Sequence, residues 1–198
     1  MDFTIDKAMR ERLEEARERG RDEMRPIGLE ADRLGRPIPS DDPYFARLIA
    51  RGEGRTRWPG PNPRPKSSRA APDSLRTVVM TLLLTEEWAY WDRGVMVANP
   101  GPSLPEGNVL ALGTDEQKEK YLGPFLEPDR PRWACFGMTE PGAGSDLASL
   151  ITTATRQGDE FVVSGQKIWT TWAHFADWMF CLVRTDPNAT KKQHGISF

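Results

Sequence analysis

The sequence has few of the side chains that bind metals or form cross-links. Its 198 residues include two cysteines, Cys135 and Cys181, and two histidines, His174 and His194. Two cysteines cannot build a disulfide framework, and the chain contains no C-x-x-C or H-x-x-x-H spacing. We therefore expect neither a disulfide-stabilised fold nor a metal site.

An excess of one charge and long apolar runs are also missing. The 27 Lys and Arg residues nearly balance 29 Asp and Glu residues, for a formal net charge of −2. Nucleic acids and anionic membranes favour basic partners, so neither is expected to bind. The longest apolar stretch, residues 78–84, is far below the roughly 20 residues of a membrane span. The charged N-terminus lacks the apolar core of a secretory signal, which predicts a cytoplasmic protein.

The first part of the chain shows the periodicity of helices. Ile5, Met9, Leu13 and Ala16 are spaced by four, four and three residues, which places them on one face of an amphipathic helix. Pro26 is expected to end this helix. The mixed charges on its other face indicate solvent contact rather than a nucleic-acid interface.

Two further helices are predicted before residue 130. Asp73 or Ser74 is suited to cap a long helix that extends to about residue 94. This helix is apolar nearly all round, so we expect it to be buried. Thr114 and Gln117 have the spacing of a capping box, which predicts the start of a shorter helix.

After Pro131 the pattern changes from helical to strand-like. Turn signals such as Gly158-Asp159 separate the candidate strands, which are residues 133–138, 150–156, 160–164, 167–171 and 178–184. Helices first and strands afterwards predict an α+β fold rather than alternating βαβ units. We place an N-terminal helical domain at residues 1–130 and a β domain at residues 131–198.

A glycine-rich turn follows the first candidate strand. Residues 138–146 read M-T-E-P-G-A-G-S-D, so small residues let backbone N–H groups approach a ligand, and Thr139 and Ser145 add hydroxyls. Taken alone, such a Gly-Ala-Gly segment is more often just a turn. It is not a Rossmann, P-loop or nucleophile-elbow motif, because the required glycines, lysine and histidine are absent.

A second segment, residues 165–172, reads G-Q-K-I-W-T-T-W. The indole of Trp169 can cover the face of a flat ring, and the hydroxyl of Thr171 can bond to a heteroatom at its edge. The alternative is a tryptophan in the core of a strand beside a β-branched neighbour.

The order of these two segments closely resembles the acyl-CoA dehydrogenase family. F-G-M-T-E-P-G-A-G-S-D is followed after some twenty residues by G-Q-K-I-W-T-T, and residues 113–126, 176–186 and 195–198 are also similar. The resemblance is specific over residues 113–198 and looser over 75–108. It implies a helical domain followed by an antiparallel β-barrel-like domain, which is incomplete in this chain.

The resemblance also implies that FAD is the cofactor. The residues that would contact it are Phe136, Met138, Thr139, Gly144, Ser145, Trp169, Thr170 and Thr171. Thr139 would bond to the pyrimidine edge of the flavin, Thr171 would lie at its N5 side and Trp169 would pack near the ring. Ser145 would lie near both the cofactor phosphates and the acyl-CoA thioester. The family usually has Ile where Thr170 stands and Asn-Gly where Trp172-Ala173 stands.

The family's reaction converts an acyl-CoA to a 2-enoyl-CoA, as in the β-oxidation of fatty acids. It needs a carboxylate base, which the resemblance places in a C-terminal helical domain, so we expect this chain to be an N-terminal fragment without catalytic residues of its own. Its own carboxylates, Glu86, Glu87, Glu140 and Asp146, are not expected to replace that base. Glu140 and Asp146 are assigned to turn and surface chemistry.

Two alternatives stay open. One is a catalytically silent subunit that keeps the flavin and CoA surface and assembles with a competent chain. The other is an acyl-CoA oxidase-like enzyme that passes electrons to oxygen. The resemblance otherwise implies an electron-transfer flavoprotein as the acceptor and a homo-oligomer or a partner chain.

Overall fold

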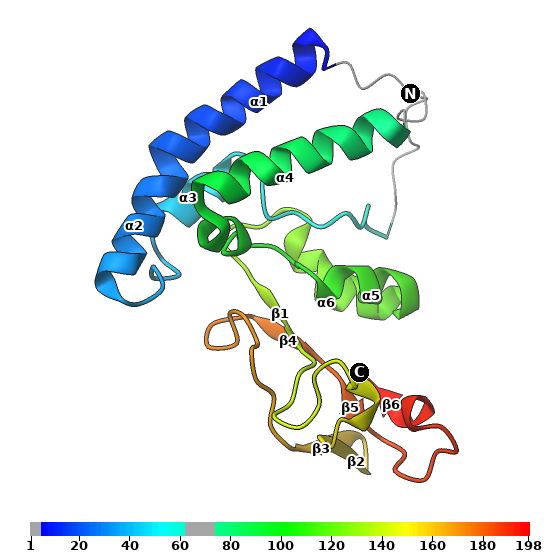
Figure 1. Cartoon of the computed structure of the whole chain (residues 1–198). Coiled ribbons are helices and arrows are strands. Elements are labelled where there is room, and N and C mark those ends of the chain that lie inside the picture. The colour runs from blue at the N-terminus through cyan, green and yellow to red at the C-terminus, as the bar shows by residue number, and fades with distance from the viewer. Residues whose placement is uncertain (1–4, 62–73) are drawn as a thin grey trace. The chain divides into compact units, whose positions relative to one another are not determined.

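The structure, a computed structural model, describes residues 5–61 and 74–198 (Figure 1). It divides into two compact units, Met1–Leu48 with Asn62–Asn99 and Ile49–Pro61 with Pro100–Phe198. Helices come first and strands later, so the α+β fold class is confirmed. The domain boundary at residue 130 stays a prediction. No helix within the described ranges is long and apolar enough to cross a membrane.

The first part of the chain is helical. Its elements are α1 (Lys7–Arg19), the π-helical turn η1 (Gly20–Met24), α2 (Arg25–Leu34), α3 (Pro43–Ala50) and α4 (Ser74–Val97). The predicted apolar face of α1 is confirmed, because Met9, Leu13 and Ala16 are buried. Met9 and Leu13 cluster with Met80 of α4, and the two helices lie side by side in Figure 1.

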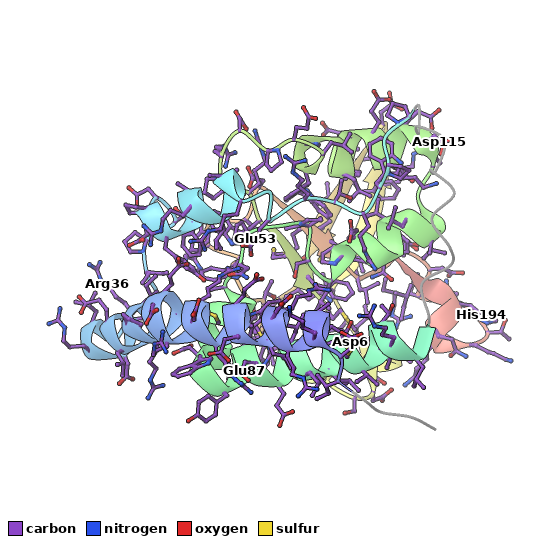
Figure 2. The ribbon with its side chains drawn as sticks, turned by 90° about the horizontal axis from the view of Figure 1, so that it is seen from above. Asp6, Arg36, Glu53, Glu87, Asp115 and His194 are labelled. Carbon is purple, nitrogen blue, oxygen red and sulfur yellow. The ribbon has the colours of Figure 1, made fainter. Side chains whose placement is uncertain are left out.

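Two ion pairs show that α1 and α4 run in the same direction. Arg76 binds Asp6 at 2.6 Å and Arg17 binds Glu87 at 3.1 Å, and both pairs are 70 residues apart in sequence. Figure 2 labels Asp6, which caps α1, and Glu87 of α4. A constant offset requires parallel helices, which need a long connection between them.

The prediction that Pro26 ends the first helix is wrong. The chain continues through η1 into α2, with Pro26 in the first turn of α2. In the π-helical turn, Arg25 donates its N–H to the carbonyl oxygen of Gly20. A proline in the first turn of a helix needs no N–H donor, so the break in the hydrogen-bond ladder accommodates it.

The expected burial of the long helix α4 is also corrected. Met80 is buried, but Val78, Leu82 and Tyr90 are 54%, 64% and 76% exposed. Helix α4 contacts α1, η1 and α2 on one part of its surface, and the rest of its surface stays exposed. The predicted cap is not described, because Asp73 and the side chain of Ser74 lie outside the described residues. Near its C-terminal end, α4 is interrupted at Asp92, whose φ is −165°.

The second unit begins with two short helices, α5 (Pro105–Leu112) and α6 (Asp115–Leu122). The predicted capping box is confirmed: Gln117 donates its N–H to Thr114 Oγ1, and Thr114 donates its N–H to Gln117 Oε1. The two helices contribute Val109 and Leu122 to a hydrophobic cluster that also contains Trp58 and Phe180.

The strands form two small sheets. They are β1 (Ala134–Gly137), β2 (Thr153–Gln157), β3 (Glu160–Ser164), β4 (Trp178–Cys181), β5 (Val183–Arg184) and β6 (Ile196–Ser197). One sheet pairs β1 with β4, and the other has the order β3-β2-β5-β6. The expected antiparallel pairing holds for β2–β3 and β5–β6, whereas β1–β4 and β2–β5 are parallel.

One predicted strand does not form. Residues 167–171 contain no strand, and Trp169 has a φ of +58°. A left-handed residue cannot continue a β-ladder, which explains why the alternating pattern failed as a predictor here. The predicted turn at Gly158-Asp159 is confirmed: Gly158 has a φ of +64° and lies between β2 and β3, which pair as antiparallel strands.

Candidate functional site

The glycine-rich turn follows β1 directly. Glu140 and Ala143 exchange two backbone hydrogen bonds of 3.0 and 3.1 Å, which closes the turn. Gly142 and Gly144 face open space: among the described residues, no atom comes within 4 Å of a Cβ built on either. A side chain at these positions would fill that space, so the glycines keep the backbone accessible to a ligand.

Glu140 points into the protein and is 3% exposed. Its Oε1 accepts hydrogen bonds from Lys167 Nζ at 2.8 Å and from the backbone N–H of Thr152 at 2.9 Å, and its Oε2 accepts from the N–H of Ile151 at 2.6 Å. The side chain of Lys167 is 8% exposed. A buried carboxylate that accepts three hydrogen bonds from the protein is well satisfied by them, which indicates a structural task.

The electrostatics of Glu140 follow from these contacts. Desolvation on burial acts to raise its pKa, but hydrogen bonds from Ile151, Lys167 and Thr152 outweigh it and lower the pKa from 4.5 to about 2. Glu140 is therefore ionised at neutral pH. A carboxylate of such low pKa is a poor proton acceptor, so it is unsuited to act as a general base.

The same contacts join the two sequence segments. Lys167 Nζ also donates to the carbonyl oxygen of Met138 at 3.2 Å. The next residue, Ile168, donates its N–H to the carbonyl oxygen of Thr139 at 2.8 Å. The start of the glycine-rich turn and the segment that leads to Trp169 are thus held side by side, although some 27 residues separate them in sequence.

Beyond this junction the second segment turns outward. Trp169 is 86% exposed with left-handed backbone geometry, a conformation that is unfavourable for a residue with a side chain. The hydroxyl oxygen of Thr170 is buried and has no hydrogen-bond partner among the described residues. A free aromatic face beside an unsatisfied hydroxyl fits a flat heterocyclic ligand such as a flavin.

An aromatic cluster anchors the end of this segment. Trp172, with a φ of +67°, lies 4.6 Å from Phe175 between ring centroids and 6.1 Å from Trp133. Phe175 in turn lies 5.1 Å from Trp133. The resemblance leads to a different residue at position 172, and in this structure the partly buried indole of Trp172 packs against the rings of Phe175 and Trp133.

The predicted cofactor contacts fall into three groups. Met138, Thr139 and Trp169 lie at or beside the junction of the two segments, and Thr170 and Thr171 follow it. Gly144 and Ser145 are exposed at the far end of the turn. Phe136 is different, because its ring lies 5.2 Å from that of Phe180 and packs against the hydrophobic cluster of the second unit.

Sequence reasoning missed the buried ion pair. The assignment of Glu140 to turn and surface chemistry is corrected, since the side chain is buried and bonded to three residues outside the turn. Lys167 was not singled out at all. No local signal identifies either residue, because the two meet only through folding. Asp146 does form a local contact, accepting from Ser149 Oγ at 2.6 Å.

Comparison with known proteins shows which family this chain resembles. The family model described as acyl-CoA dehydrogenase, middle domain, matches residues 135–198. Acyl-CoA dehydrogenase IpdE1 of Mycobacterium tuberculosis is 41% identical over 113 residues, which are 57% of this chain and 29% of the relative.

Solved structures are similar over nearly the whole chain. Butyryl-CoA dehydrogenase of Megasphaera elsdenii superposes with a TM-score of 0.71 at 29% identity, covering 99% of this chain and 48% of that one. The ChsE4–ChsE5 complex of M. tuberculosis gives a TM-score of 0.68 at 31% identity, covering 100% and 47%. This chain therefore spans about half the length of these structures and less than a third of the curated relative.

Proposed function

We propose a function from one premise: this chain is a member of the acyl-CoA dehydrogenase family. The function is to provide the flavin-contacting loops of an enzyme that oxidises the Cα–Cβ bond of an acyl-CoA thioester to the 2-enoyl-CoA. The observation that carries it is the junction between Thr139 and Ile168, which leaves Trp169 exposed beside the open glycine turn.

The residues of the site fit FAD. The hydroxyl of Thr139 is assigned to the pyrimidine edge of the flavin, the indole of Trp169 to its ring, and Thr171 to its N5 side. The unsatisfied hydroxyl of Thr170 offers a further hydrogen bond. Bound FAD supplies a two-electron acceptor, which no side chain of the chain can provide.

The open glycine turn is assigned to the substrate and to the anionic part of the cofactor. Its small residues admit a bulky ligand close to the backbone, and Ser145 can donate its hydroxyl to a thioester carbonyl or a phosphate oxygen. The reaction also requires a base for the α-proton. Glu140 is excluded from that role by its low pKa and its three hydrogen bonds, so we assign the base to a carboxylate outside this site.

The test is a flavin titration followed by reduction. Purified chain is mixed with FAD, and binding is followed by the visible spectrum and by quenching of flavin fluorescence. Anaerobic addition of acyl-CoAs of different chain length then tests for bleaching of the flavin. Uptake of FAD supports the proposal. Bleaching also needs the base, so it is expected only when the carboxylate assigned outside this site is supplied, and hydrogen peroxide on admission of air then supports the oxidase-like alternative. A chain that takes up no FAD contradicts the proposal.

A second candidate is a flavin-binding subunit that acts only with a partner chain. It is favoured by the similarity to one structure described as a two-protein complex, ChsE4–ChsE5. FAD binding without bleaching by any acyl-CoA, restored by a second chain, is the result expected for this alternative. An electron-transfer flavoprotein as the electron acceptor remains part of the proposal, and adding such a protein to the same assay tests it. Self-association of the chain also remains part of the proposal.

A further inference from the structure

The buried pair of Glu140 and Lys167 lies between the two loops that carry the proposed flavin contacts. Glu140 belongs to the glycine-rich turn, next to Thr139, and Lys167 precedes Ile168 and Trp169. Neither side chain is accessible enough to meet a ligand, since the two are 1% and 8% exposed. The pair can therefore affect a ligand only through the neighbouring residues to which it is hydrogen-bonded.

The pair connects three separate stretches of the chain. Glu140 receives hydrogen bonds from Ile151 and Thr152, which precede β2, and from Lys167. Lys167 returns a hydrogen bond to the carbonyl oxygen of Met138. Because each charged group has more than one partner, a shift of either loop would break several bonds at once.

The backbone hydrogen bond from Ile168 to Thr139 lies immediately beside the pair. This bond sets the position of Thr139 relative to Trp169, and no regular strand pairing supports it, since residues 167–171 form no strand. The left-handed conformation of Trp169 also needs support from its surroundings, because it is unfavourable by itself.

We propose that the Glu140–Lys167 pair is the positioning element of the site, which fixes the loop bearing Thr139 against the segment bearing Trp169 and thereby sets the shape of the flavin surface. The inference rests on the proposed function for its cofactor, but the loop geometry that it describes is measurable without one. The two residues are positioning residues and touch no reacting atom.

The experiment compares three variants. Lys167→Met removes the ammonium and leaves a buried carboxylate with fewer partners, which is strongly destabilising. Glu140→Gln with Lys167→Met removes both charges, so no lone charge stays buried and much of the stability returns. Glu106→Gln is the matched control, because Glu106 is a second buried carboxylate of the same unit, 5% exposed, bonded to Thr56 and Arg57 and not to either loop.

The first readout is amide hydrogen exchange in the chain without ligand. In the double variant we expect the Ile168 N–H to exchange about a hundredfold faster relative to the Ala134 N–H, which bonds to Gly101 outside the junction. In the control variant we expect the ratio of the exchange rates of the Ile168 and Ala134 N–H groups to stay at its wild-type value. A double variant whose Ile168 exchange stays at the wild-type ratio overturns the proposal.

The second readout is the affinity for FAD. We expect the double variant to bind at least about tenfold more weakly and the control to bind within about threefold of wild type. Wild-type affinity in a double variant that is as stable as the control also overturns the positioning role. If the wild-type chain binds no FAD, the proposed function fails, and hydrogen exchange alone decides whether the pair positions the loops.

Discussion

Gly165 lies against Thr152 so closely that a Cβ built on the glycine would come within 2.4 Å of the Thr152 hydroxyl oxygen and 2.6 Å of its Cα. The contact brings the start of the second loop onto the residue whose N–H binds Glu140. Gly165 also has a φ of +152°, which residues with side chains rarely adopt.

We predict that Gly165→Ala lowers the free energy of unfolding by about 2 kcal/mol or more, because the methyl group overlaps backbone atoms that cannot move aside. Urea denaturation followed by tryptophan fluorescence measures the change. The matched control is Gly158→Ala, where φ is +64° but the described residues leave the space open, so only backbone strain of about 1 kcal/mol is expected. Equal effects of the two substitutions would argue against the close contact.

The second prediction concerns pH and Glu140. Its folded-state pKa of about 2 lies below the ordinary value of 4.5, so its contribution to stability is fully present above about pH 4.5 and is lost as the pH falls towards 2. At about 1.4 kcal/mol per pKa unit, this contribution is on the order of 3 kcal/mol. The nearby Cys181 stays neutral in this range, because desolvation raises the pKa of its thiol.

The measurement is urea unfolding of wild type and Glu140→Gln from pH 6 to pH 2. We expect the difference in stability between them to shrink steadily below pH 4.5. Other carboxylates with lowered pKa, such as Asp129 beside Arg132, affect both proteins alike and cancel in the difference. A difference that is independent of pH would show that Glu140 does not ionise as described.

The third prediction concerns Trp169. Because the side chain is 86% exposed and its backbone is left-handed, Trp169→Gly is expected to keep or raise the stability of the chain by about 1 kcal/mol while weakening FAD binding. Thermal unfolding and flavin titration measure the two effects. Trp133 is 3% exposed, so Trp133→Ala is expected to cost about 3 to 5 kcal/mol. A loss of that size at Trp169 would place its indole in the core instead.

The fourth prediction uses two helical glycines. A Cβ on Gly20 would lie 2.0 Å from the indole of Trp91, where η1 packs on α4, so Gly20→Ala is expected to destabilise the helical unit by about 1 to 3 kcal/mol. Gly107 in α5 is exposed, and the described residues leave the space beside it open. Gly107→Ala is expected to stabilise by about 0.5 to 1 kcal/mol, because alanine favours the helix. Circular dichroism on heating compares the two.

Features that depend on neighbours in sequence were predictable. The spacing of Met9, Leu13 and Ala16 identified the buried face of α1, and the capping box at Thr114 identified the start of α6. Gly158-Asp159 identified the turn between β2 and β3. In each case the pattern lies in residues that are close in sequence, so it can be recognised without knowing which distant residues pack against it.

Features that depend on distant partners were not predictable. The pattern at residues 167–171 resembled a strand, but the junction with Thr139 and the left-handed Trp169 exclude one. Helix α4 was expected to be buried from its composition, yet only the number of helices packed against it decides how much of it is covered. Pro26 was expected to end a helix that a π-helical turn allows to continue.

The sequence by itself determined the family resemblance, the α+β order of elements and the two loops that carry the proposed flavin contacts, because these are properties of short contiguous segments. Only the tertiary structure decided that the loops meet, and that Glu140 and Lys167 hold them together. The physical reason is the loss of water on burial: a carboxylate and an ammonium that would be ordinary surface groups on an open chain become strongly bound partners once folding removes both from solvent.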